Sequence, residues 1–462
     1  MIVLAAIVLI LYASVTFYLA GKIFIRHQFH FLLYYILLIL STYTIVISLI
    51  HSGFLFRPLT FLIQYLKEII LFGSVLFFII SDRTILSKKW SWKPLDIWFI
   101  LFVLLVLGYL LLPIGPASFL SKAVYTKNVL LMVISYFLGR NVIMSWPQWS
   151  RVFKGISYLT LFAAGIIIIE KISGVHLHSL IGFSQYHLDI YDQEPAGPYH
   201  LTWTFVASGG QKRFAALFAN PLELAASMLL SISMAYYFFT HSRIQSNRRF
   251  FLMVLVVAIM TVVFAYSRAS FVAVFMMFLV IAVLLRYYGL LVGIATVFVL
   301  VLLYLVTLAP RDVQYFVLDT ISFRETSSIT HAIEWFEAIE SIQAYPLGTG
   351  LATSGNAGGV ESDLKVGGEN QFLVYGVQLG VIGLMIYSLI YVTAIFSSAR
   401  VFRQHEGTLI AGVPLIAAAT KAGLFLPLMT ANAETYMYVS MITWWMVGYS
   451  LQMDKRARID AK

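Results

Sequence analysis

Two arginines in this sequence stand where they could bind an anionic group. Arg213 opens the run RFAALFANPLELAA, and Arg268 lies inside the run AYSRASF. A guanidinium group binds phosphate oxygens bidentately and stays charged at any relevant pH. Both arginines precede long apolar stretches, so interfacial anchoring of the side chain is the alternative interpretation. If the arginines are functional, the chemistry that they favour is recognition of a phosphate-bearing headgroup.

A third polar position follows a glycine-rich stretch in GGENQFLVYGVQLGVIGL. Glu369 and Asn370 stand where an apolar helix is expected to begin, and a helix N-terminus exposes free backbone N–H groups. Glu369 could therefore simply cap that helix. Gly376, Gly380 and Gly383 predict close approach of another helix. The preceding PLGTG is not a phosphate-binding P-loop, because it lacks the Gly-Lys-Ser/Thr ending.

The composition indicates whether these residues belong to a water-soluble protein or to a membrane protein. Of the 462 residues, 60% are hydrophobic and 11% are charged, far from the roughly 25% charged residues of a soluble domain. The chain has no cysteine, which excludes thiol catalysis, thiolate metal sites and disulfides. The formal charge of +10 is better explained by cytoplasmic loops than by nucleic acid. The sequence predicts an all-α, polytopic integral membrane protein that lies in the lipid bilayer and binds no nucleic acid.

Apolar runs long enough to cross a bilayer recur along the whole chain. We predict a single membrane domain over residues 1–462 with about 13 transmembrane helices (12–14). The expected spans are 2–21, 31–52, 59–80, 96–114, 124–142, 155–173, 213–240, 250–266, 270–285, 289–308, 371–397, 407–428 and 434–452. Residues 1–21 lack a basic n-region, so we interpret them as the first span and not as a signal peptide.

Basic residues gather in alternate connections, for example Arg243, Arg248 and Arg249. The positive-inside rule then predicts an outer N-terminus and a cytoplasmic C-terminus. Two large loops fall outside, over 174–212 and 309–370. The second contains the amphipathic run ITHAIEWFEAIESIQ, which predicts a helix.

Several further polar residues need an interpretation. Asn220, Pro221 and Glu223 are expected about two turns deeper than Arg213, and Pro221 predicts a kink in that span. The histidines of the first loop show no metal-ligand spacing, and we expect them to be solvated or at best to contact substrate. Lys67, Glu68 and Lys421 fall within predicted spans, where charge is costly; a structural ion pair or a polar cavity is the expected explanation, and ion coupling the alternative.

Taken together, the segments RFAALFANPLELAA, YSRASF, WFEAIESIQAYPLGTG and ENQFLVYGVQLGVIGL resemble the bacterial O-antigen ligase and O-antigen polysaccharide polymerase superfamily. They cover about residues 213–383. The resemblance implies a GT-C-like glycosyltransferase that works without metal or other cofactor on the outer face of the bacterial inner membrane. Its donor would be a glycan carried on undecaprenyl pyrophosphate. A chain-length regulator is left open as a further partner.

The resemblance also implies residue roles. Arg213 and Arg268 would hold the donor pyrophosphate and stabilise the leaving group through preorganised charge. Family ligases carry a histidine directly before the asparagine that starts the helix after the large loop. This sequence has Glu369 there, and a carboxylate can still act as general base for an acceptor hydroxyl. The residues that we assign to substrate binding are Asn220, Glu223, Arg324, His331, Trp335 and Asn370.

These roles favour a polymerase that joins lipid-linked oligosaccharide repeat units into a surface polysaccharide such as an O-antigen, a capsule or an exopolysaccharide. The nearest alternative is a ligase that transfers the glycan to a lipid or other acceptor. A flippase or exporter of lipid-linked sugar would need charged residues along the whole depth of a pathway, and the residues of interest here gather at one face. A structural scaffold would survive loss of Arg213 and Arg268.

Overall fold

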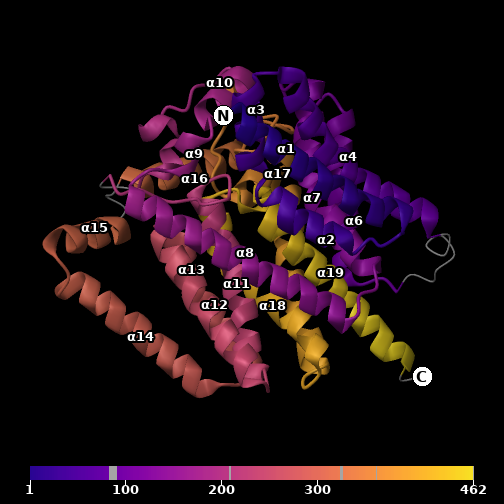
Figure 1. The fold of residues 1–462 in the computed structure, drawn as a ribbon, viewed down its shortest axis with the longest axis vertical. Coiled ribbons are helices and arrows are strands. Elements are labelled where there is room, and N and C mark those ends of the chain that lie inside the picture. The colour runs from indigo at the N-terminus through magenta and orange to yellow at the C-terminus, as the bar shows by residue number, and fades with distance from the viewer. Residues whose placement is uncertain (83–90, 208–209, 323–325, 361, 461–462) are drawn as a thin grey trace. The chain divides into compact units, whose positions relative to one another are not determined.

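The computed structural model describes residues 1–82, 91–207, 210–322, 326–360 and 362–460. Over these residues the chain is helical, apart from turns, loops and an isolated β-bridge between Val206 and Lys212. The helices, labelled in Figure 1, belong to two compact units. The first unit comprises residues 1–91, 134–268 and 436–452, and the second comprises 92–133, 269–435 and 453–462.

The first unit is built from the N-terminal helices and those around the first predicted loop. Its elements are α1 (Ile2–Ala20), η1 (Gly21–Ile25), α2 (Phe31–Tyr35), η2 (Ile36–Leu40), α3 (Tyr43–Phe54), α4 (Arg57–Ser81), α8 (Trp146–Ser173), α9 (Leu177–Leu180), α10 (Phe183–Tyr191), η3 (Pro198–His200), η4 (Trp203–Phe205), α11 (Pro221–His241) and α12 (Gln245–Phe264), together with the end of α7 (Phe119–Asn141) and most of α19 (Met437–Asp460). Helix α11 lies at its centre and packs against α8 and α12.

The second unit holds the second predicted loop and the helices around it. Its elements are α6 (Pro94–Leu111), the start of α7, α13 (Arg268–Leu284) after its first residue, α14 (Tyr288–Thr307), α15 (Arg311–Ile321), α16 (Thr326–Ala344), η5 (Ser362–Leu364), α17 (Gln371–Gln404), η6 (Leu409–Ala411), α18 (Gly412–Thr430) and η7 (Ala433–Thr435). Helix α17 is central here, and α6, α16 and α18 all pack against it.

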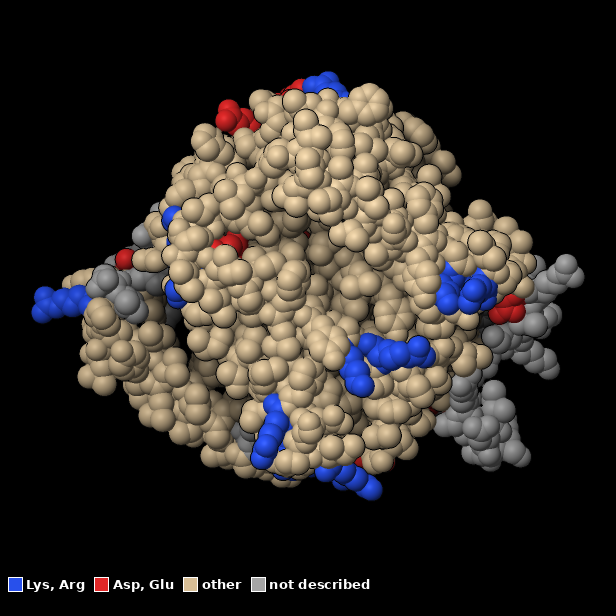
Figure 2. Space-filling view, viewed as in Figure 1, with Lys and Arg blue, Asp and Glu red and all other residues tan. Residues whose placement is uncertain are grey.

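The apolar helices confirm an integral membrane protein. Eight helices of the described chain are long and apolar enough to cross a bilayer, and the bent pair formed by 31–40 and 43–54 would make a ninth. The face drawn in Figure 2 is dominated by uncharged residues, as contact with lipid requires. The other predicted spans coincide with α7, α13, α14 and α19, of which α13 has only 17 residues. The count of about 13 spans therefore stays a prediction.

The predicted kink at Pro221 is wrong, because α11 begins at this residue. Residues 213–220 form an irregular loop and a turn outside the helix, and Asn220 is the N-cap, whose side chain accepts a hydrogen bond from the backbone N–H of Glu223 at 2.9 Å. Proline suits the first helical position, where its missing N–H would have had no partner in any case. Arg213 consequently lies on a loop that precedes the span.

The amphipathic helix predicted in the second loop is α16, but the apolar side chains that define the predicted face are not the ones that pack. Ile329, Ile333, Phe336 and Ile339 are all exposed on α16. The residues that pack are Ala338 and Ile342, which meet Val377 of α17 in a small apolar cluster. Gly376 permits this approach, since a Cβ there would come within 2.5 Å of the Ile342 side chain.

Helix α17 is broken at Gly380, whose φ of 71° and ψ of −171° are not helical. The break frees backbone groups, and the segment YPLGTG pairs with them. The backbone N–H of Thr349 donates to the Val377 carbonyl at 2.8 Å, and the N–H of Val381 donates to the Pro346 carbonyl at 2.9 Å. Gly380 was expected to admit a neighbouring helix; it admits this loop instead, because a Cβ there would overlap the Pro346 carbonyl.

We predict that Gly380→Ala destabilises the fold. The backbone region occupied by Gly380 is almost restricted to glycine, so a side chain there costs roughly 1–3 kcal/mol, and the overlap with Pro346 adds to this. Gly108→Ala in α6 is the matched control, because nothing lies within 4 Å of its added Cβ. Thermal unfolding of detergent-purified protein should show a lower Tm for Gly380→Ala only. Equal Tm values for the two variants would contradict the account of the break.

The predicted orientation can be tested because the chain has no cysteine of its own. Gln193 and Ser246 are both exposed and lie on connections of opposite predicted sidedness. In right-side-out membrane vesicles, a membrane-impermeant maleimide should label Gln193→Cys directly and Ser246→Cys only after permeabilisation. The reverse pattern would show that the N-terminus is cytoplasmic.

Candidate active-site residues

In the second unit, Glu369 pairs with a histidine that is distant in sequence. The Glu369 carboxylate Oε2 meets Nδ1 of His331, which α16 presents. Both side chains are partly exposed, at 29% for Glu369 and 23% for His331. The pair joins a carboxylate to an imidazole, and both groups can accept and return protons. The structure thus brings together two residues that the sequence analysis assigned to different roles.

The backbone before Glu369 is held tightly against α16. Gly367 has a φ of 57°, and a Cβ on it would approach the Glu334 carbonyl oxygen and the Ala338 side chain at 2.9 and 3.1 Å. The backbone N–H of Glu369 donates to the Glu334 carboxylate. The Glu334 carboxylate is thereby placed beside Glu369, and two carboxylates lie near one imidazole.

Burial raises the pKa of Glu334, and the neighbouring negative charge of Glu369 raises it further, while Lys365 and His331 act in the opposite direction. The protonated form of Glu334 is therefore favoured in the folded protein relative to the unfolded chain.

Asn370 and Trp335 complete this group. The Asn370 side chain accepts hydrogen bonds from the backbone N–H groups of Phe372 and Leu373, at 3.0 and 3.3 Å, and so caps α17. Because Asn370 is the cap, the carboxylate of Glu369 is not needed for that purpose. Trp335 follows His331 by four residues on α16, so the two share one face. Its indole N–H is buried and has no hydrogen-bond partner among the described residues, so it could donate to a ligand.

In the first unit, Arg213 lies on a loop fixed by backbone hydrogen bonds. Its N–H donates to the Phe205 carbonyl at 2.9 Å. The buried Glu170 of α8 accepts from the N–H of Ala216 at 3.3 Å and from the N–H of Leu177 at 2.7 Å. One carboxylate therefore ties the segment that carries Arg213 to the start of the first predicted loop.

The first-loop histidines differ in burial, and the expectation of solvated side chains is wrong for two of them. His176 and His178 are 1% and 0% exposed and lie among aromatic rings, with Phe205 contacting both. Nε2 of His178 lies 2.9 Å from the Phe218 carbonyl. Burial lowers the pKa of His176 to about 4 and that of His178 to about 3. Both are therefore neutral packing residues near neutral pH, a role that their sequence spacing does not reveal.

Arg268 is the first residue of α13 and follows a turn of three residues after α12 ends at Phe264. The tight connection agrees with the expected short turn. Tyr266 within it has a φ of 47°. The structure assigns Arg213 and Arg268 to the first unit and Glu369, Asn370, His331 and Trp335 to the second.

Two further predicted substrate contacts have structural roles at the start of α11. Asn220 caps the helix, and the 8%-exposed Glu223 accepts in return from the N–H of Ala219 at 3.3 Å. The first bond satisfies an otherwise free helix N–H group, and the second ties the residue before the cap to the first turn of the helix. Their substrate role stays a prediction. Arg324, also predicted to bind substrate, lies outside the described residues.

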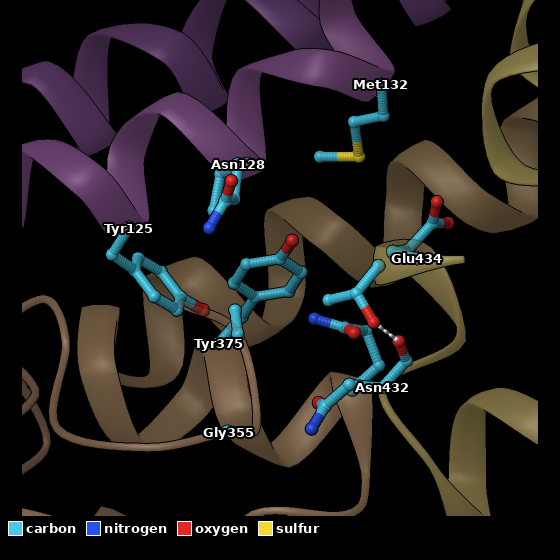
Figure 3. Close-up of a pocket in the computed structure, with 11 residues that line it drawn as sticks. Tyr125, Asn128, Met132, Gly355, Tyr375, Asn432 and Glu434 are labelled. Atoms are coloured by element: carbon cyan, nitrogen blue, oxygen red, sulfur yellow. Dashed lines mark hydrogen bonds between the residues drawn. The ribbon is translucent and has the colours of Figure 1, made fainter. Parts of the chain in front are cut away.

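The sequence analysis missed Glu434, which is the buried partner of Lys421. The Lys421 Nζ and a Glu434 carboxylate oxygen are 3.4 Å apart, and the Tyr387 hydroxyl donates to the same oxygen at 2.9 Å. Lys421 was expected to form a structural ion pair, and it does. The sequence did contain a signal for Glu434. It is the carboxylate in the polar run ANAET, directly before the last apolar stretch. Glu434 also lines a small pocket with Asn128, Tyr375 and Asn432 (Figure 3).

No group of three or more His, Asp or Glu side chains arranged to hold a metal ion occurs within the described ranges. The functional groups that remain are the arginines and the histidine–glutamate pair.

The fold and these groups together define a multi-pass helical membrane protein with a candidate acid–base pair. Residues 252–388 match the family described as O-antigen ligase. The match includes Arg268, His331 and Glu369 and confirms the resemblance seen in the sequence. The family supports a glycosyltransferase-like enzyme of O-antigen or related polysaccharide biosynthesis. No curated protein matches the chain in a sequence search.

We predict that Glu334→Gln stabilises the protein in a pH-dependent way. Because the folded-state pKa of Glu334 is raised, wild type loses stability as the pH rises through that value, whereas glutamine does not ionise. The Tm of Glu334→Gln should exceed that of wild type at about pH 8 and approach it at about pH 4, near the ordinary glutamate pKa. The exposed Glu337→Gln is the control. The same Tm difference at both pH values would contradict the assignment.

Proposed function

We propose that this protein is a glycosyltransferase of the bacterial inner membrane that polymerises lipid-linked oligosaccharide repeat units on the outer face. The observation that carries the proposal is the His331–Glu369 pair at the start of α17, inside the segment that matches the O-antigen ligase family. An undecaprenyl-pyrophosphate-linked glycan would be the donor, in keeping with the family. The N-terminus would lie outside and the C-terminus in the cytoplasm.

In the proposed reaction, a hydroxyl oxygen of the acceptor repeat unit attacks the anomeric carbon of the donor glycan. The bond between that carbon and the pyrophosphate oxygen breaks, and its electron pair leaves with the lipid pyrophosphate. Glu369 takes the hydroxyl proton, and His331 stabilises the protonated carboxyl group through their contact. The developing negative charge of the leaving group is stabilised by guanidinium groups, for which Arg213 and Arg268 are the candidates.

The charges of the arginines make a metal ion unnecessary for holding the pyrophosphate in this scheme. Guanidinium groups offer several N–H donors in a fixed plane that fits phosphate oxygens. Arg213 is suited to such a role, because its loop is pinned through Phe205 and Glu170. Preorganised charge of this kind stabilises a transition state without moving during the reaction.

A ligase is the second candidate, because the matched family is described as O-antigen ligase. Family ligases carry a histidine at the position of Glu369, and in this chain an imidazole reaches Glu369 from α16 instead. The two functions share a donor and differ in the acceptor. A polymerase accepts a second lipid-linked repeat unit, and a ligase accepts another lipid or a different molecule.

The test is polymer formation from purified undecaprenyl-pyrophosphate repeat units in liposomes that contain the protein and a chelator. Wild type should produce long chains. Arg213→Ala, Arg268→Ala and Glu369→Gln should each lose a hundredfold or more in rate, equivalent to about 3 kcal/mol of barrier. Arg286→Ala, an exposed residue beyond the other end of α13, and Glu337→Gln are matched controls that should retain activity.

The outcomes of this assay distinguish a polymerase from a ligase and from a flippase. A wild-type protein that leaves the repeat units unlinked, but transfers the glycan to an added lipid acceptor, would replace polymerase by ligase. Activity that survives all three substitutions would keep the reaction and discard the assigned residues. A chain that moves lipid-linked glycan across the bilayer without forming glycosidic bonds would be a flippase.

A further inference from the structure

The carboxylate of Glu334 occupies a position that costs the folded protein stability. Its Oε2 is buried and accepts no hydrogen bond from the described residues. Burial and the neighbouring negative charge of Glu369 both raise the pKa of Glu334. A buried acceptor without a donor is destabilising, and more so when it carries a charge. Since a glutamine of nearly the same shape would avoid that charge, the carboxylate needs a functional explanation.

The positive groups around Glu334 are bound to other partners. Lys365 and His331 are the side chains that lower the pKa of Glu334. The Lys365 Nζ donates to Oδ1 of Asn356 at 2.6 Å, and Nδ1 of His331 contacts the Glu369 carboxylate. The two carboxylates and the imidazole therefore form one electrostatic group, with Lys365 at its edge.

Glu334 is also joined to Glu369 through the backbone. The N–H of Glu369 donates to the Glu334 carboxylate. The turn that precedes Glu369 lies against α16 at the same place, because a Cβ on Gly367 would come within 2.9 Å of the Glu334 carbonyl oxygen. Glu334 follows His331 by three residues on α16, so the two lie on neighbouring parts of one helix face. Glu334 thus holds the residue whose side chain meets His331.

The electrostatic effect between the two carboxylates is mutual. The charge of Glu369 acts on Glu334, and by the same Coulomb interaction an ionised Glu334 opposes the ionised form of Glu369. A carboxylate that holds its charge less readily takes up a proton more readily. That property suits a general base that works near neutral pH.

We infer that Glu334 is a positioning residue for the proposed base: it holds the Glu369 backbone, and its charge makes the Glu369 carboxylate a better proton acceptor. The inference rests on the proposed function, in which Glu369 takes the proton of the acceptor hydroxyl. The two contributions can be separated by substitution. Glutamine at position 334 keeps an oxygen that accepts the Glu369 N–H and removes the charge, whereas alanine removes both.

The charge coupling is tested first without turnover. Diethyl pyrocarbonate modifies neutral imidazole, and His331 is 23% exposed, so the pH dependence of its modification, followed by mass spectrometry of its peptide, gives its titration midpoint. Nearby carboxylates stabilise the imidazolium form, so Glu334→Gln should move the midpoint to lower pH by about half a unit or more. Glu337→Gln, an exposed position on the same helix, should leave it in place. An unchanged midpoint in Glu334→Gln would overturn the inference.

The positioning role is tested in the liposome assay at about pH 8, above the ordinary glutamate pKa. Glu334→Gln should lower kcat about tenfold without changing KM, although its Tm is expected to exceed that of wild type. Glu334→Ala should lose a hundredfold or more in kcat, since the backbone bond is lost as well. The rate of wild type should fall in two steps as the pH is lowered, first when Glu334 and then when Glu369 takes up a proton. Glu334→Gln should show only the second step.

The two readouts separate failure of this inference from failure of the proposed function. Polymer formation by Glu334→Gln with the kcat and pH profile of wild type would overturn the inference and leave the proposed function intact. A shifted His331 midpoint in a protein whose wild type forms no glycosidic bond would reject the proposed function, and with it the role of Glu334 in positioning a base.

Discussion

The break in α17 at Gly380 is the constraint on which the candidate site depends. In apolar surroundings, each backbone group that leaves a helical hydrogen bond must find another partner. The YPLGTG segment supplies these partners at Thr349 and Pro346. The side chain of the fully buried Gln378 adds two more bonds, to the Ala352 N–H at 2.7 Å and to the Ser354 carbonyl at 2.8 Å. The loop between α16 and α17 is thus fixed to α17 around its break.

This attachment of the loop to α17 fixes the position of the backbone around Glu369. The first part of α17 begins at Gln371 with Asn370 as its cap, and the loop returns to α16 at Gly367. Between these two fixed points, the Glu369 side chain meets His331. Elsewhere in the second unit, Lys421 and Glu434 form an ion pair, because a charge in an apolar environment is costly unless it is paired. The rigid scaffold and the paired charges are two consequences of the same low-dielectric environment.

Much of the helical framework could be predicted from the sequence, because apolar runs and charged connections follow directly from the bilayer. The helix over 326–344 was also predictable from its periodicity. The break at Gly380 was not, since a glycine in an apolar run equally indicates close helix packing. Pro221 was misinterpreted because a proline at the first helical position and one inside a helix look alike without the boundary. The pocket was invisible because its lining comes from residues near 128, 371 and 432, which only the tertiary fold brings together.

In the proposed reaction, the residue at position 369 takes the proton of the acceptor hydroxyl. The most direct test is the pH dependence of kcat/KM for the acceptor in wild type and in Glu369→His, with protein folding matched by Tm. An imidazole base titrates about two pH units above a carboxylate in ordinary surroundings. The account predicts that Glu369→His retains turnover, with the acid limb of its profile displaced to higher pH. A variant that turns over with an acid limb identical to that of wild type would contradict it.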